Sequence, residues 1–180
     1  MRILGVSGSL REASTNSRLL VAATHLVPSE MELRVTSNVG KLPLFSPDAR
    51  TTDARALHEW INEVRTANGI IISTPEYAGG YPGALKNAFD WLVGTDAFVN
   101  KPFMLLKASP RSVLAQDTFA KVLETMSGVH MEGATAMIPL LGTKLVVREI
   151  LENRTFAETI RKSLATFLSG VKRHRIETAA

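Results

Sequence analysis

The stretch from Ile3 to Arg18 carries a dense set of side chains suited to binding an anion. Its apolar start, its break by Gly5 and Gly8 and its later helical spacing predict a strand, a loop and a helix. A helix N-terminus offers unpaired N–H groups and a positive dipole end, so a phosphate monoester fits it. The loop supplies hydroxyl and amide donors and one guanidinium, at Ser9, Arg11, Ser14, Thr15, Asn16 and Ser17.

A simpler interpretation of this loop is that Ser14, Thr15 or Asn16 only caps the helix. We favour the anion site, since one cap residue would suffice and the loop has several donors and an arginine. The loop matches neither the dinucleotide fingerprint nor the Walker A sequence. A hydrolase with Ser7 as nucleophile is disfavoured, because Gly8 is followed by Ser9 where the nucleophile elbow needs glycine.

A second candidate ligand loop follows a buried strand. Ile70, Ile71 and Ile72 form an uninterrupted branched run, which is typical of a central strand in a parallel sheet. The chain then makes a turn rich in proline and glycine, with tyrosines at 77 and 81, and enters a helix near Pro82. Open parallel sheets bind ligands at the carboxyl ends of their strands. Together the two loops suit a ligand with a phosphate tail and a flat head.

The remaining segments alternate between strand and helix patterns. Strands are predicted near 3–6, 32–36, 70–72, 103–107 and 135–138, and helices near 19–27, 53–67, 82–92, 112–126 and 153–169. Residues 38–53 are predicted to form a loop, and Ser109 follows the fourth strand at the ligand edge. This alternation predicts an α/β three-layer domain over residues 1–180, with five parallel strands in the order 2-1-3-4-5.

Composition narrows the class of protein. The 180 residues carry a formal net charge of +4 and no cysteine, which excludes disulfides, thiolate metal sites and cysteine catalysis. No apolar run approaches the length of a membrane span, so we expect a cytoplasmic protein without a membrane partner. The basic residues 172–175 are interpreted as a solvated cluster after a helix, and nucleic acid is not expected as a partner.

The two loops resemble those of the NADPH-dependent FMN reductase family. The resemblance rests on three motifs: Gly8-Ser9-Leu10-Arg11-x-x-Ser14-x-Asn16, Thr74-Pro75-Glu76-Tyr77 and Pro82-Gly83-Ala84-Leu85-Lys86-Asn87-Ala88-x-Asp90-Trp91. It implies a flavodoxin-like fold, with FMN as cofactor and NADPH or NADH as hydride donor. It also implies a small-molecule electron acceptor such as a quinone or free flavin, a homodimer or homotetramer, and no need for a protein acid or base.

The resemblance further implies which residues hold FMN. Those implied for the phosphate are Ser9, Arg11, Ser14, Asn16 and Ser17. Those implied around the flavin ring are Pro75, Glu76, Tyr77 and Ala78, and the predicted cofactor site is completed by Gly79 and Ser109.

The chain departs from the family pattern at two places. The family usually has asparagine and an aromatic residue at positions 78 and 79, and its loop after the fourth strand is longer and carries paired glycines. Glu76 is interpreted as structural rather than as a general base, and Phe89 and Trp91 as core or interface. The alternative function is a non-enzymatic FMN electron-transfer protein, but such carriers generally present an acidic surface, which a net charge of +4 disfavours.

Overall fold

A parallel sheet organises the computed structural model, which describes residues 1–48, 55–111 and 113–179. Its strands are β1 (Arg2–Ser7), β2 (Glu32–Val35), β3 (Gly69–Ser73), β4 (Pro102–Lys107), β5 (Val129–His130) and β6 (Ala136–Met137). Their order is β2-β1-β3-β4, with both β5 and β6 paired to β4, and the pairs are parallel. The predicted fold class and strand order are therefore confirmed.

The fifth place in the sheet is shared by two short strands rather than held by one. β5 pairs with the start of β4, at Pro102 and Phe103, and β6 pairs with its end, at Leu106 and Lys107. A 3-10 turn, Glu132–Ala134, separates β5 from β6. The sequence predicted only the second of these strands, because two residues at 129–130 are too few to show an alternating pattern.

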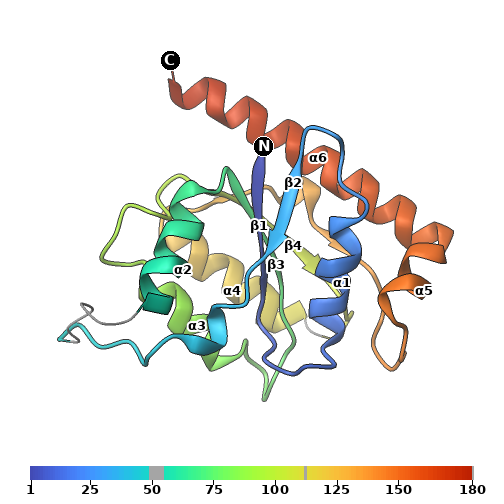
Figure 1. Cartoon of the computed structure of the whole chain (residues 1–180), viewed down its shortest axis with the longest axis horizontal. Helices are drawn as coiled ribbons and strands as arrows, with labels where there is room; N and C mark the ends of the chain where they lie inside the picture. The colour runs from blue at the N-terminus through green and yellow to red at the C-terminus, as the bar shows by residue number, and fades with distance from the viewer. Residues whose placement is uncertain (49–54, 112, 180) are drawn as a thin grey trace.

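Helices cover both faces of the sheet. They are α1 (Thr15–Thr24), α2 (Arg55–Thr66), α3 (Gly83–Asp90), α4 (Val113–Thr125), α5 (Val147–Glu152) and α6 (Arg154–Ala179), with a 3-10 turn at Val39–Lys41. In Figure 1, α1 and α5 lie on one side of the strands and α2, α3 and α4 on the other. This is the predicted three-layer arrangement. The predicted helix starts at 53 and 112 lie outside the described residues.

The central strand β3 separates two apolar clusters. Ile71 faces the cluster that contains α1 and α6, whereas Ile70 and Ile72 face the cluster under α2, α3 and α4. All three isoleucine side chains are completely buried. Because successive side chains of a strand point to opposite faces, this one branched run anchors both helix layers. The carboxyl end of β3, where the second ligand loop begins, is therefore held firmly on both faces.

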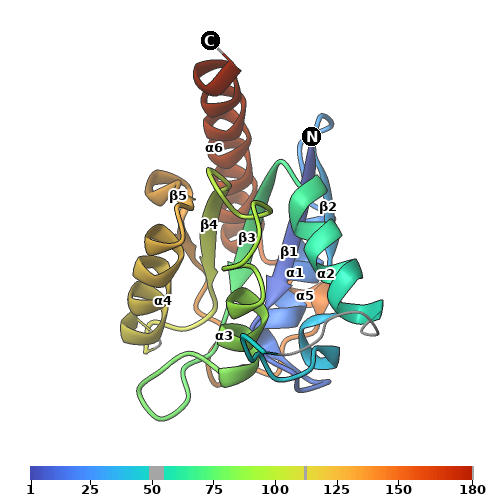
Figure 2. The ribbon, with the colours of Figure 1, turned by 90° about the vertical axis from the view of Figure 1, so that its left-hand side faces the viewer.

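The closing helix is longer than predicted, and its basic residues belong to it. α6 continues past Ser169 to Ala179 and projects beyond the sheet, as Figure 2 shows. The predicted stop before Gly170 was wrong, because this glycine allows close packing within the fold: a Cβ there would lie 3.0 Å from the sulfur of Met131.

The basic residues of α6 contact the amino-terminal edge of the sheet. Lys172 donates to Glu30 at 2.6 Å and holds the pKa of that carboxyl below its usual range, while His174 Nε2 lies 2.9 Å from Asn100 O. Residues 172–175 thus lie within α6 and not after a helix, which corrects the predicted position, while Arg173 and Arg175 are exposed to solvent as predicted. Over the described residues, no helix combines the length and the apolar character that crossing a bilayer requires.

Candidate functional site

Loops that follow β1, β3, β4 and β6 together line a cleft of about 230 Å³ at the carboxyl edge of the sheet. Of the predicted site residues, the lining includes Arg11, Ser14, Asn16, Pro75, Glu76, Tyr77 and Ser109. It also includes Thr15, which the sequence analysis named as a donor of the first loop, and three residues that were not predicted, namely Ala13, Ala108 and Leu141. The two loops that the sequence singled out therefore meet in one cleft.

The start of α1 supplies the cationic and hydroxyl groups of the cleft. Ser14 is the N-cap of α1, and its oxygen accepts a hydrogen bond from Ser17 N–H at 3.2 Å. A hydroxyl that accepts in a cap keeps its own hydrogen to donate, so capping and anion binding are compatible roles for Ser14. Arg11 is exposed, and among the described residues its guanidinium has no carboxylate partner. Its positive charge is available to a ligand.

Asn16 joins the two ligand loops. Its side-chain oxygen accepts a hydrogen bond from Ser73 Oγ at 2.9 Å, at the end of β3, and both residues are buried. The oxygen is therefore committed to the fold, and the amide nitrogen is the group that remains for a ligand in the cleft. This bond fixes the position of the first turn of α1 relative to the strand that leads into the second loop.

Ser9 and Ser17 shape the first loop from inside and do not line the cleft. Ser9 Oγ accepts from Arg11 N–H at 3.3 Å, and Ser17 Oγ lies 2.8 Å from Ser7 Oγ. Among the described residues, the hydroxyl of Ser7 bonds to the backbone of Ser9 and to the hydroxyl of Ser17, and not to a histidine as a hydrolase nucleophile would. Direct contact of Ser9 and Ser17 with a phosphate stays a prediction.

The second loop is a tight hairpin. Tyr77 and Gly80 exchange backbone hydrogen bonds of 2.8 and 3.0 Å across Ala78 and Gly79, which have positive φ values of 50° and 76°. Two central residues with positive φ are the pattern of a type I′ turn. Ala78 and Gly79 sit at the exposed tip outside the cleft lining, while Tyr77 lines the cleft.

The two tyrosines of this loop differ in their surroundings. Tyr77 is half-exposed and borders the cleft, whereas the ring of Tyr81 lies 4.8 Å from that of Phe119 and packs against the core. Phe89 is completely buried, in agreement with its interpretation as a core residue. A ligand role is therefore open to Tyr77, and Tyr81 has a packing role.

Replacing Ala78 with asparagine is expected to raise the free energy of unfolding by about 0.5–1 kcal/mol, because left-handed backbone strains alanine more than asparagine. Replacing it with valine, which is β-branched, should lower that free energy instead. Urea unfolding of the two variants and the wild type checks both signs. A valine variant more stable than the asparagine variant would contradict the turn geometry seen here.

Helix α4 holds the second loop in place through two hydrogen bonds. Glu76 Oε2 accepts a hydrogen bond from Ala115 N–H at 3.2 Å, in the first turn of α4, and Gln116 Nε2 donates to Thr74 O at 3.1 Å. A carboxylate at a helix N-terminus satisfies unpaired N–H groups and interacts well with the dipole. The geometry therefore agrees with a structural role for Glu76.

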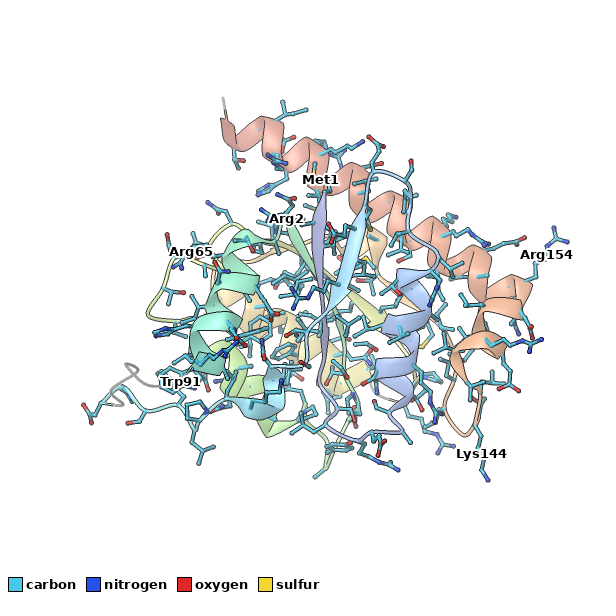
Figure 3. The ribbon with its side chains drawn as sticks, in the orientation of Figure 1. Met1, Arg2, Arg65, Trp91, Lys144 and Arg154 are labelled. Atoms are coloured by element: carbon cyan, nitrogen blue, oxygen red, sulfur yellow. The ribbon has the colours of Figure 1, made fainter. Side chains whose placement is uncertain are left out.

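The sequence missed the residues that fasten the loop after β2. Asn87 Nδ2 and Trp91 Nε1 donate to Pro43 O at 2.9 and 2.8 Å, and Asn87 Oδ1 accepts from Phe45 N–H at 2.7 Å. Both side chains come from α3 or its end, and Trp91 is labelled in Figure 3. Asn87 and Trp91 both belong to the third motif, which marked them as notable, but the motif does not reveal that they bind the backbone of Pro43. Leu141 had no local signal.

Fold and site together define a class of protein: a flavodoxin-like domain whose cleft joins a helix start rich in hydrogen-bond donors to a loop with an aromatic side chain. The sequence profile of the NADPH-dependent FMN reductase family matches residues 1–140. The chain belongs to this family, and the resemblance seen in the three motifs is confirmed.

Known proteins similar to this chain have names that agree with the family. One is an NAD(P)H-dependent FMN reductase of Pseudomonas aeruginosa, 35% identical over 112 residues, and another is a quinone reductase of Escherichia coli, 28% identical over 113 residues. Each match covers 61% of this chain and 60% of the relative. Among solved structures, the flavoenzyme FerB of Paracoccus denitrificans has a TM-score of 0.76 at 21% identity, over 96% of this chain and 98% of FerB, which shows the shared fold.

Proposed function

We propose that this protein is an FMN-dependent oxidoreductase that passes electrons from NADPH or NADH to a small acceptor such as a quinone or free flavin. The observation that carries the proposal is the single cleft in which Arg11, Ser14 and Asn16 meet Pro75 and Tyr77. One part of the cleft is cationic and rich in donors, and another offers proline and an aromatic ring. FMN has a phosphate and a flat ring that match these two parts.

The donor set fits the phosphate of FMN. Arg11 provides a fork of N–H groups, Ser14 and Thr15 provide hydroxyls, and Asn16 provides an amide nitrogen at the N-terminus of α1. The carboxylate in the lining, Glu76, accepts from Ala115 N–H. Pro75, Tyr77 and Ser109 are assigned to the rest of the cofactor, with Ala78 and Gly79 shaping the turn and Ser9 and Ser17 the first loop.

When bound, FMN would supply the redox chemistry, taking two electrons from the nicotinamide and passing them to the acceptor. The residues of this chain would bind and orient it, and the loop after β2, fastened by Asn87 and Trp91, would keep its place over α3. We assign no side chain as a general acid or base.

The proposal also includes a cytoplasmic location and assembly of identical subunits. Assembly is supported by large apolar side chains that lie exposed, such as Leu10 at 59% and Leu44 at 86% exposure. Contact between subunits would remove such side chains from water. Analytical ultracentrifugation of the FMN-loaded protein tests this part, and a monomer across the micromolar range would contradict it.

The function is tested by loading the protein with FMN, removing free flavin and adding NADPH or NADH without oxygen. We expect the visible absorption of oxidised flavin to disappear, and to return when a naphthoquinone is added. Free FMN at the same concentration is the control for reduction without protein. Bound flavin that neither nucleotide reduces would contradict the enzyme and support the electron-transfer alternative.

A further inference from the structure

One wall of the cleft comes from a segment that the family match does not include. Leu141 lines the cleft together with Ala108 and Ser109, and its side chain is 51% exposed. The family profile ends at residue 140, immediately before it. Leu141 thus completes the site from a part of the chain that the family match leaves unassigned.

Backbone hydrogen bonds hold Leu141 in this position. Ile138 N–H donates to Lys107 O at 2.8 Å and Leu140 N–H donates to Ala108 O at 3.0 Å, so the pairing of β6 with β4 continues to the edge of the cleft. Leu140 is completely buried. Gly142, with φ of 78°, and the bond from Thr143 N–H to Leu140 O at 3.1 Å turn the chain directly afterwards. Leu141 therefore lies between a buried anchor and a turn.

The far end of the same segment is fastened to the helix that starts the anion site. Arg18 of α1 donates through Nη1 to Leu145 O at 3.4 Å. Helix α5 follows and lies beside α1 in Figure 1, and its buried Ile150 shares an apolar cluster with Leu19. Lys144, labelled in Figure 3, marks the loop between the two attachments. The segment that carries Leu141 is therefore attached to α1, the helix whose N-terminus forms the proposed anion site.

The loop after β4 contributes few residues to the side of the cleft where Leu141 lies. β4 ends at Lys107 and α4 begins at Val113, so few residues lie between them. Ser109 offers the cleft a hydroxyl, which accepts a hydrogen bond from Arg111 N–H at 3.0 Å, and it adds no large apolar surface. The apolar surface on this side of the cleft comes from Ala108 and the larger Leu141.

We propose that Leu141 is a binding residue for the uncharged part of the flavin, its ring or ribityl chain. This rests on the proposed function and assigns a contact to that same site. A half-exposed leucine gains free energy when a ligand covers it, and this gain does not depend on a phosphate group. Leu141 should therefore contribute equally to the binding of FMN and of riboflavin, in contrast to Arg11, which should act on FMN alone.

The test is a fluorescence titration of each flavin into wild-type protein and three variants. Leu141→Ala is expected to raise the dissociation constants of FMN and riboflavin by the same factor, about three- to tenfold. Leu141→Met, which keeps an apolar side chain of similar size, should stay within about twofold of wild type. Val146→Ala is the matched control, since Val146 is similarly exposed on the same segment but does not line the cleft.

The outcomes separate this proposal from the proposed function. Wild-type protein that binds neither flavin contradicts both. Wild-type binding that Leu141→Ala leaves unchanged, or that Val146→Ala weakens as much, overturns the assignment of Leu141 alone. A loss confined to FMN overturns it too, because it would place Leu141 with the phosphate. Equal weakening of both flavins by Leu141→Ala, with methionine and the control near wild type, supports it.

Discussion

Gly8→Ala is expected to lower the free energy of unfolding by about 1–3 kcal/mol and to weaken FMN binding by on the order of tenfold or more. An alanine Cβ at this position would lie 2.2 Å from Thr74 Oγ1 and 2.7 Å from Thr74 Cβ. Thr74 is buried, and Gly8 N–H donates to Ser73 O at 2.9 Å, so the two chains cannot separate without losing this bond. Gly8 is where the two ligand loops pass each other, and a side chain there pushes them apart.

The measurements are urea unfolding and FMN titration, with Gly83→Ala as the control. Gly83 is the exposed first residue of α3, and a Cβ there would meet no atom within 4 Å. Because alanine has a higher helix propensity than glycine, the Gly83→Ala control should be as stable as wild type or slightly more stable. If Gly8→Ala binds FMN as tightly as the control does, the close approach of the two loops is not what shapes the site.

Arg11→Gln is expected to raise the dissociation constant of FMN by about 10- to 100-fold and to leave that of riboflavin unchanged. Glutamine keeps a polar side chain but removes the charge, and a hydrogen bond to a charged group is stronger than a neutral one. Arg11 is exposed beside the N-terminus of α1, so the substitution should not change the free energy of unfolding. Titration of both flavins into the variant measures the loss.

Arg111→Gln is the matched control for charge. Arg111 is exposed on the loop after β4 and does not line the cleft, so its loss removes the same charge from the same edge of the sheet. It should change FMN affinity only slightly, and that change should vanish at high salt. Equal effects of the two substitutions would mean that Arg11 acts through the general field of the protein and does not contact the phosphate.

The sequence predicted correctly those elements whose local residue pattern is enough to define them, and missed those that depend on contacts between distant parts of the chain. The branched run at 70–72 and the glycine and proline residues that follow it placed the central strand and its loop correctly. The end of α6 was missed because Gly170 looks like a helix stop along the chain, yet its neighbour is Met131, which is distant in sequence. The split of the fifth strand was missed because β5 and β6 each have only two residues, and their pairing with β4 is a tertiary contact.

The site was predictable in part for the same reason. Arg11, Ser14 and Tyr77 lie in motifs whose charged, hydroxyl and aromatic side chains are typical of ligand binding. The parallel sheet brings these motifs to one edge. Leu141 carries no such signal, since an exposed leucine in a loop is common and its neighbour Ala108 is known only from the fold. The inward contacts of Ser9 and Ser17 depend on the exact path of the loop.

A crystal structure of the protein grown with FMN tests the central claim most directly. We predict the phosphate at the N-terminus of α1, within hydrogen-bond distance of Arg11 and Ser14, and the flavin ring beside Pro75 and Tyr77. Flavin bound at another place, or with its phosphate away from α1, would contradict the assignment of this cleft as the cofactor site.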